Sequence, residues 1–244
     1  YKQTLTDAAK KAEASTRDTI AKAQALYKDI VAHPDVLEDT QHQDVLYNNA
    51  ETHFILRDYP ATIAAGETLL NATLTPNPPI QAKTNYLMGH AAWKIASDTG
   101  DGNYTQVKEF YRNALDLDPF YGEKGNISHL AEIRLINAYF FVDQKYDEAI
   151  RRFEEAVKRY PESDYTYLTY FWYGQACEKY GDELLAQFKT QENSANTSPQ
   201  DQATLREKAK NLFSTAVIQY RNAIDSRDRS KYKDSQNEEY LIQI

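Results

Sequence analysis

Residues 133–161, IRLINAYFFVDQKYDEAIRRFEEAVKRYP, decide the fold. Apolar residues recur in this stretch at three- and four-residue spacing, which predicts two amphipathic helices rather than strands. The second of these carries Ala149, Phe153 and Ala156 on one face, and Pro161 ends it. Small residues let two helices approach closely, and the aromatic ring fills the groove beside them. The stretch therefore predicts a closely packed pair of antiparallel helices.

The same spacing returns three more times along the chain, with decreasing regularity. A small residue stands at Gly89 in one first helix and at Gly174 in another, and Gly181 is expected in the turn after that helix. The first copy is the weakest, because Thr62 and Gly66 replace the small residue and the aromatic of its second helix. The second-helix positions of the other two copies hold Val107, Tyr111, Ala114, Ala216, Tyr220 and Ala223.

This pattern resembles the tetratricopeptide repeat family. The resemblance implies an all-α fold, a right-handed superhelical solenoid of antiparallel helix pairs. About four pairs are expected over residues 43–228, after a long N-terminal helix and linker over 1–42 and before a C-terminal helix over 229–244. Two stretches depart from the family, since loops at Ser97–Gly102 and Thr190–Ala203 are expected to interrupt pairs that it joins tightly.

Composition narrows the class of protein. The chain has 244 residues with only 8 Gly and 8 Pro, which suits long helices and argues against a β-sandwich. The net charge of −8 disfavours a nucleic-acid partner, because phosphate binding needs a basic face. No apolar run reaches the roughly 18 residues that a membrane span needs. Because the chain begins at Tyr1, we expect membrane association only through a removed anchor or through a partner.

The sequence contains no recognised catalytic constellation. The five His residues form no metal-ligand motif, and Gly100 and Gly102 occupy oxygen-ligand positions of the calcium-like stretch Asp98–Glu109. The carboxylates around Glu148 and Glu154 have the spacing of helical ion pairs. Cys177 is expected to be buried and inert. We therefore expect no metal, no cofactor and no enzymatic activity.

The resemblance also implies a concave surface lined by the first helix of each pair. We expect Tyr86 and Trp93 at its centre, with Lys83, His90 and Lys94 as a cationic rim. Two competing interpretations stay open: that these side chains pack on neighbouring helices, and that Trp93 belongs to the core. The predicted groove consists of Tyr47, Glu51, Phe54, Lys83, Tyr86, His90, Trp93, Arg134, Phe141, Phe171 and Gln175.

An aromatic groove of this kind predicts a scaffold or adaptor that binds a protein or peptide partner. The run from Phe153 to Tyr160, Pro161 and Ser163 is similar to bacterial envelope tetratricopeptide proteins, such as outer-membrane assembly lipoproteins. It implies a periplasmic or cell-envelope location, with the cytoplasm as the alternative, and oligomerisation stays open. The second functional hypothesis is a substrate-delivery component that binds a small molecule and partners a transporter. An enclosed pocket of about 300–1,000 Å³ would favour that role over the adaptor.

Overall fold

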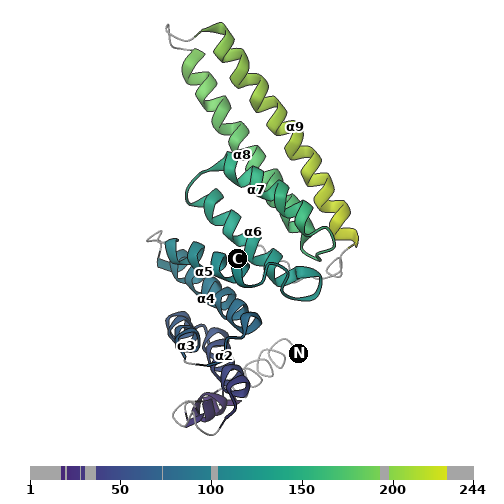
Figure 1. The fold of residues 1–244 in the computed structure, drawn as a ribbon. Helices are drawn as coiled ribbons and strands as arrows, with labels where there is room; N and C mark the ends of the chain where they lie inside the picture. Colours follow the sequence, from purple (N-terminus) through teal and green to yellow (C-terminus); the bar gives the residue numbers. More distant parts are fainter. Residues whose placement is uncertain are drawn as a thin grey trace, which may run out of the picture. The chain divides into compact units, whose positions relative to one another are not determined.

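The computed structural model describes residues 18, 19, 21–27, 29, 30, 37–72, 74–99, 104–192 and 198–229, and the all-α prediction is confirmed over them. These described residues form helices joined by short connections, and no strand occurs among them (Figure 1). Of the long helix expected near the N-terminus, the described residues between 18 and 30 are helical and the rest lies outside the described part. The helix expected over 229–244 also lies outside it, apart from Arg229.

The chain divides into two compact units, Tyr1–Asp118 and Pro119–Ile244. Within the first unit, each helix packs on the next, and α2 also contacts α4. Asp58 starts the second helix, because its carboxylate accepts a hydrogen bond from the Ala61 backbone N–H at 3.2 Å. The helices are α2 (Asp39–Ile55), α3 (Tyr59–Asn71), α4 (Pro78–Thr99) and α5 (Thr105–Leu117).

Glycine allows the closest helix approaches in the first unit. A Cβ on Gly89 would lie 2.8 Å from a ring carbon of Tyr111, so the small residue expected at this position does face the aromatic of α5. A Cβ on Gly66 would lie 2.5 Å from the sulfur of Met88. The irregular first copy is thereby explained, because Met88 enters from α4 and fills the space left at Gly66.

The second unit repeats this order of contacts. Its helix α6 packs on α7, α7 on α8 and α8 on α9, while α6 also contacts α8. Ala149, Phe153 and Ala156 are completely buried in its core beside Ile136 and Phe140, as their spacing predicted. The elements are the 3₁₀ turn η2 (Glu123–Gly125) and the helices α6 (Asn126–Phe141), α7 (Tyr146–Arg159), α8 (Thr166–Glu192) and α9 (Pro199–Arg229).

A buried polar corner joins the start of α6 to the turn between α7 and α8. The amide oxygen of Asn126 accepts hydrogen bonds from the Ser163 hydroxyl at 2.8 Å and from the Asp164 backbone N–H at 3.0 Å. The Tyr160 hydroxyl donates to the Pro119 carbonyl at 2.8 Å. Tyr160 and Ser163 therefore have a structural role here, because their hydroxyls hold the corner together.

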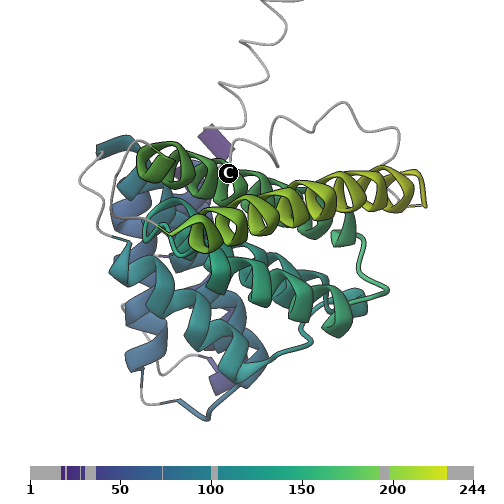
Figure 2. The ribbon, with the colours of Figure 1, turned by 90° about the horizontal axis from the view of Figure 1, so that it is seen from above.

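Helices α8 and α9 form a long antiparallel hairpin (Figures 1 and 2). The expected loop at Thr190–Ala203 was wrong in extent, since α8 continues to Glu192 and α9 begins at Pro199. The expected turn at Gly181 was also wrong, because this residue lies inside α8, where its Cβ would be 2.9 Å from the Phe213 ring. The insertion thus lengthens both helices, and the hairpin packing compensates for a glycine within a helix. The start of the loop expected at Ser97–Gly102 was likewise wrong, because α4 extends to Thr99, and residues 100–103 lie outside the described part.

Candidate functional site

Part of the predicted groove lies in the first unit, where α2 and α4 run side by side. Phe54 contacts His90 edge to face, with ring centroids 4.8 Å apart, and it lies 5.6 Å from Tyr59. The Tyr86 ring follows at 6.5 Å from His90. All four side chains are half-buried, so each presents part of its ring to the surface. The structure therefore brings three residues of the predicted groove, Phe54, Tyr86 and His90, into one aromatic cluster.

Three polar and aromatic groove residues bind one another beside this cluster. The Lys83 ammonium lies 3.8 Å from the centroid of the Tyr47 ring, and the Tyr47 hydroxyl donates to Glu51 at 3.2 Å. Tyr47 is only 6% exposed. It therefore acts as a floor that orients Glu51 and Lys83, and the charged groups rather than the phenol remain for a ligand.

Trp93, expected at the centre of the groove, is also part of the contact between α4 and α5. Its indole meets the ring of Tyr104 at 5.2 Å, and Tyr86 lies 6.0 Å from Tyr111. The side chains of Trp93 and Tyr86 are both half-buried. One side of the Trp93 ring and one side of the Tyr86 ring thus pack on a neighbouring residue of α5 or its N-terminal end, as the competing interpretation proposed.

The groove residues of the second unit fall into two environments. Phe141 is 50% exposed and meets Trp172 edge to face at 5.3 Å, while Phe171 lies 5.2 Å from the same indole. Gln175 is half-buried one turn further along α8. Arg134 is only 5% exposed, so its expected place on an open surface is wrong.

Trp172 is the residue of this cluster that sequence reasoning missed. The repeat pattern predicted that Phe171 lies in the groove, and it made no prediction for Trp172. Trp172 nevertheless touches two cores of the second unit and joins the rings of Phe141 and Phe171. A tryptophan next to an aromatic groove position was the available signal, since tryptophan is the residue most enriched among binding hot spots.

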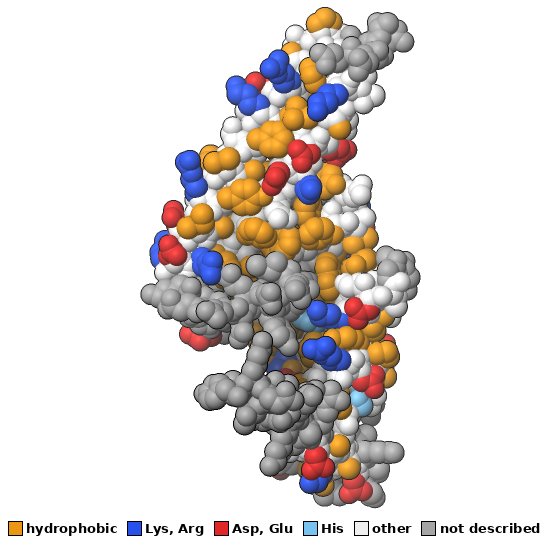
Figure 3. Space-filling model, turned by 180° about the vertical axis from the view of Figure 1, so that it is seen from behind, with side chains coloured by type: hydrophobic (Ala, Val, Ile, Leu, Met, Phe, Trp, Pro, Cys, Tyr) orange, Lys and Arg blue, Asp and Glu red, His pale blue; other side chains and the backbone are white. Residues whose placement is uncertain are grey.

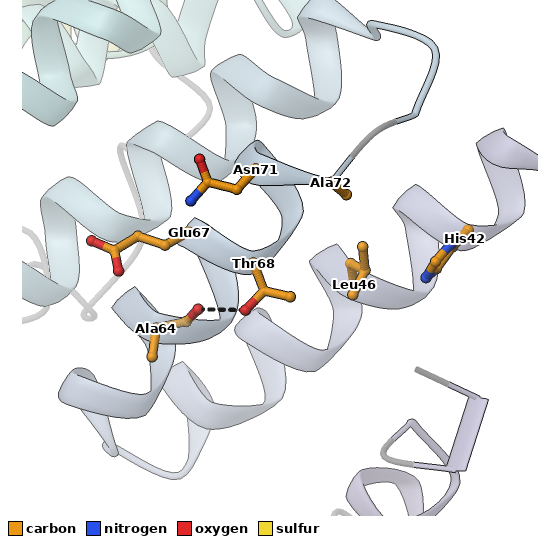
Figure 4. A pocket seen from close by; sticks show the side chains of 7 residues that line it. All are labelled: His42, Leu46, Ala64, Glu67, Thr68, Asn71 and Ala72. Carbon is orange, nitrogen blue, oxygen red and sulfur yellow. Dashed lines mark hydrogen bonds between the residues drawn. The ribbon is translucent and has the colours of Figure 1, made fainter. Parts of the chain in front are cut away.

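A depression of about 530 Å³ lies between α2 and α3 and opens to solvent (Figure 4). His42 and Leu46 from α2 face the row Ala64, Glu67 and Thr68 of α3 across it, and the Thr68 hydroxyl donates to the Ala64 carbonyl at 2.9 Å. Two further open depressions, of about 710 and 1,060 Å³, lie along α9. None of these three is an enclosed cavity.

Titratable groups in the described part of the chain serve packing and surface ion pairs. Arg151 binds Glu148 at 2.8 Å and Glu155 at 2.6 Å, which confirms the helical ion pairing. The prediction that Cys177 is buried is also confirmed, and burial raises the pKa of its thiol to about 12. No group of three or more His, Cys, Asp and Glu side chains suited to a metal ion occurs among the described residues. Within the same residues, no helix combines the length and apolar composition of a bilayer span.

The fold and this surface define a class: over the described residues, an all-helical protein in which neighbouring helices pack and partly exposed aromatic side chains lie on α2, α4, α6 and α8. No protein-family model matches the chain, and no curated protein matches it at a significant level.

Proposed function

We propose that the chain is a tetratricopeptide-type repeat protein that binds a peptide or protein segment and performs no catalysis. The repeated order of contacts supports the repeat assignment, because in both units the third helix packs against both helices of the preceding pair. The glycine-to-ring contacts at Gly89 and Gly174 support it as well, since they recur in the first helix of two pairs.

The observation that carries the binding role is the cluster of Phe54, Tyr86 and His90. These rings lie on two adjacent first helices and are held by contacts among themselves, so a ligand meets a surface that is already ordered. Binding to such a surface costs little conformational entropy in the protein. Lys83 and Glu51 sit beside the rings in fixed positions, which suits a segment with an apolar anchor and a polar group one turn away.

A phage-displayed peptide library panned against the chain tests this proposal. We expect enriched peptides to lose at least about thirty-fold in affinity for Phe54→Ala and Tyr86→Ala, the loss typical of a hot spot. Ile218→Ala is the matched control, because Ile218 is an exposed apolar residue of the second unit and lies outside the predicted groove. Peptides that bind the parent and both groove variants equally would refute the assignment of the surface.

The location in a bacterial cell envelope is part of the proposal and rests on the resemblance around Tyr160 and Ser163. Fractionation of the native source tests it directly, with the cytoplasmic fraction as the alternative outcome. The role in small-molecule delivery stays a prediction, and the three open depressions are not the enclosed pocket that it requires.

A further inference from the structure

One side of the hairpin of α8 and α9 carries a short stripe of exposed apolar side chains. On α9, Val217 and Ile224 lie seven residues apart, which is about two helical turns and places them on one face. Val217 is 50% and Ile224 is 62% exposed. Hydrophobic side chains gather along this hairpin, in the upper part of the view in Figure 3.

This stripe lies beside the face by which α9 binds α8. That inner face uses Ala209, Ala216 and Ala223, which are buried and recur every seven residues. The rings of Phe213 and Tyr220 belong to it as well, since they lie against Gly181 and Gly174 of α8. The outer stripe instead borders the depression of about 1,060 Å³, which Leu185 and Phe188 of α8 line from the opposite side. A further helix would therefore find apolar side chains from both helices of the hairpin.

Charged residues flank the stripe in a pattern that is complementary to itself. Arg206 lies eleven residues before Val217, and Asp228 lies eleven residues after it. Lys210 lies seven residues before Val217, and Asp225 lies eight residues after it. If two copies of α9 met in antiparallel fashion with Val217 on the two-fold axis, Arg206 of one copy would lie opposite Asp228 of the other. Lys210 would lie one residue from the position opposite Asp225. A parallel arrangement would place Arg206 against Arg206.

The two outermost charges of this pattern, Arg206 and Asp228, do not pair with each other in a single chain. Neither Arg206 nor Asp228 has an ion-pair partner in the described part of the protein. They are 22 residues apart on one helix, which corresponds to about 33 Å, so they cannot bind each other within one copy. Arg206 and Asp228 can therefore form an ion pair with each other only between two chains.

The size of the face also suits a second copy. From Arg206 to Asp228 the hairpin extends about 33 Å, and two helices packed 8–10 Å apart make it about 20 Å wide. About 650 Å² per copy and about 1,300 Å² in the pair would thus be buried, within the range of about 1,200–2,000 Å² for specific interfaces. Two antiparallel hairpins joined in this way form a four-helix bundle.

We propose that the outer stripe of the α8–α9 hairpin is a homodimer interface in which two copies of α9 pack antiparallel about Val217. The proposal is independent of the peptide-binding role, since it uses other residues. It predicts that the chain has twice its 28.0 kDa mass in solution and dissociates on dilution. It also predicts weaker association at high salt, because the flanking ion pairs are screened.

Analytical ultracentrifugation over a range of concentrations tests the interface. Val217→Lys places two like charges at the axis and should raise the dimer dissociation constant at least about thirty-fold. Ile218→Lys is the matched control, because Ile218 is the adjacent residue, is 54% exposed and does not line the depression. This control should leave the dissociation constant within a few-fold of the parent.

A charge exchange tests the antiparallel arrangement. Arg206→Asp and Asp228→Arg should each weaken the dimer, and the double variant should restore it. A parent that is monomeric at every concentration overturns the proposal and assigns the face to another segment or partner. A dimer that persists in Val217→Lys, or one that the double variant fails to restore, overturns it as well.

Discussion

The indole of Trp93 meets the ring of Tyr104 edge to face, with centroids 5.2 Å apart. Seven residues earlier in α4, Tyr86 lies 6.0 Å from Tyr111, which is seven residues later in α5. The two pairs form an antiparallel ladder that fastens α4 to α5. The side chains placed at the centre of the groove therefore also stabilise their own helix pair, so a loss of binding in their variants has to be separated from a loss of stability.

Replacing Trp93 by Ala should lower the free energy of unfolding by about 2 kcal/mol. A completely buried tryptophan would cost about 3–5 kcal/mol, whereas an exposed one would cost about 0.5 kcal/mol or less. The half-buried indole also loses an edge-to-face contact of about 0.5–1.5 kcal/mol. Urea denaturation measures the difference, and Trp93→Phe should retain most of the stability. A cost above about 4 kcal/mol would show that the indole belongs entirely to the core.

Replacing Gly181 by Ala should destabilise the protein, although alanine is the better helix former by about 1 kcal/mol. The new Cβ would lie 2.9 Å from the Phe213 ring and would force α8 and α9 apart. We expect a net loss of about 1–3 kcal/mol, as in other overpacked cores. Thermal denaturation of Gly181→Ala, and of Gly181→Ala combined with Phe213→Leu, provides the measurement. A more stable single variant would contradict the close approach, and the double variant should recover part of the loss.

Cys177 should resist thiol reagents in the native protein at pH 8. Its side chain is completely buried, and burial raises the pKa of the thiol to about 12, whereas a free cysteine has a pKa of about 8.5. Labelling by an aromatic disulfide reagent should therefore be at least about a thousand times slower than in urea, because the thiolate is the reactive form. Comparable rates in the two conditions would contradict the burial.

His129 should make stability fall as the pH drops below about 6.5. The imidazole is completely buried, and its Nε2 shares a hydrogen bond of 2.7 Å with the Thr169 hydroxyl. It stacks on the Tyr160 ring with centroids 4.6 Å apart. Burial lowers its pKa to about 3, while the unfolded chain binds a proton near pH 6.5. The unfolded state thus gains protons first, and stability declines by up to about 1.4 kcal/mol per pH unit between these two values.

The variant His129→Gln isolates this contribution. Glutamine can still bind the Thr169 hydroxyl but does not titrate, so the stability difference between parent and variant should change between pH 7 and pH 5. Carboxylates shared by both proteins cancel in that difference. A difference that stays constant with pH would show that the imidazole is accessible to protons in the folded state.

The helical pattern of the sequence predicted the cores of both units because short-range spacing determines which face of a helix is buried. Ala149, Phe153 and Ala156 are completely buried, and Gly89 faces Tyr111 as expected. The limits of the α8–α9 hairpin could not be predicted in this way. Polar residues after Thr190 indicate a loop by composition, but helix pairing stabilises them as helix up to Glu192.

The candidate site, too, could be predicted only in part from the sequence. The residue types of the groove were evident from their spacing, and Phe54, Tyr86 and His90 do come together. Their exposure was not evident, since Arg134 lies buried and Trp172 takes a place that no pattern assigned.

By itself the sequence determined that this protein is all-helical, that Ala149, Phe153 and Ala156 face inward, and that Gly89 permits close packing. These properties follow from local periodicity, which a single chain segment contains in full. Only the tertiary structure decided which ring meets Gly181, how far Trp93 is covered and that the stripe around Val217 remains open. Each of these depends on a partner from a distant part of the chain, or on the lack of one among the described residues, and helical spacing carries no information about which helix that partner comes from.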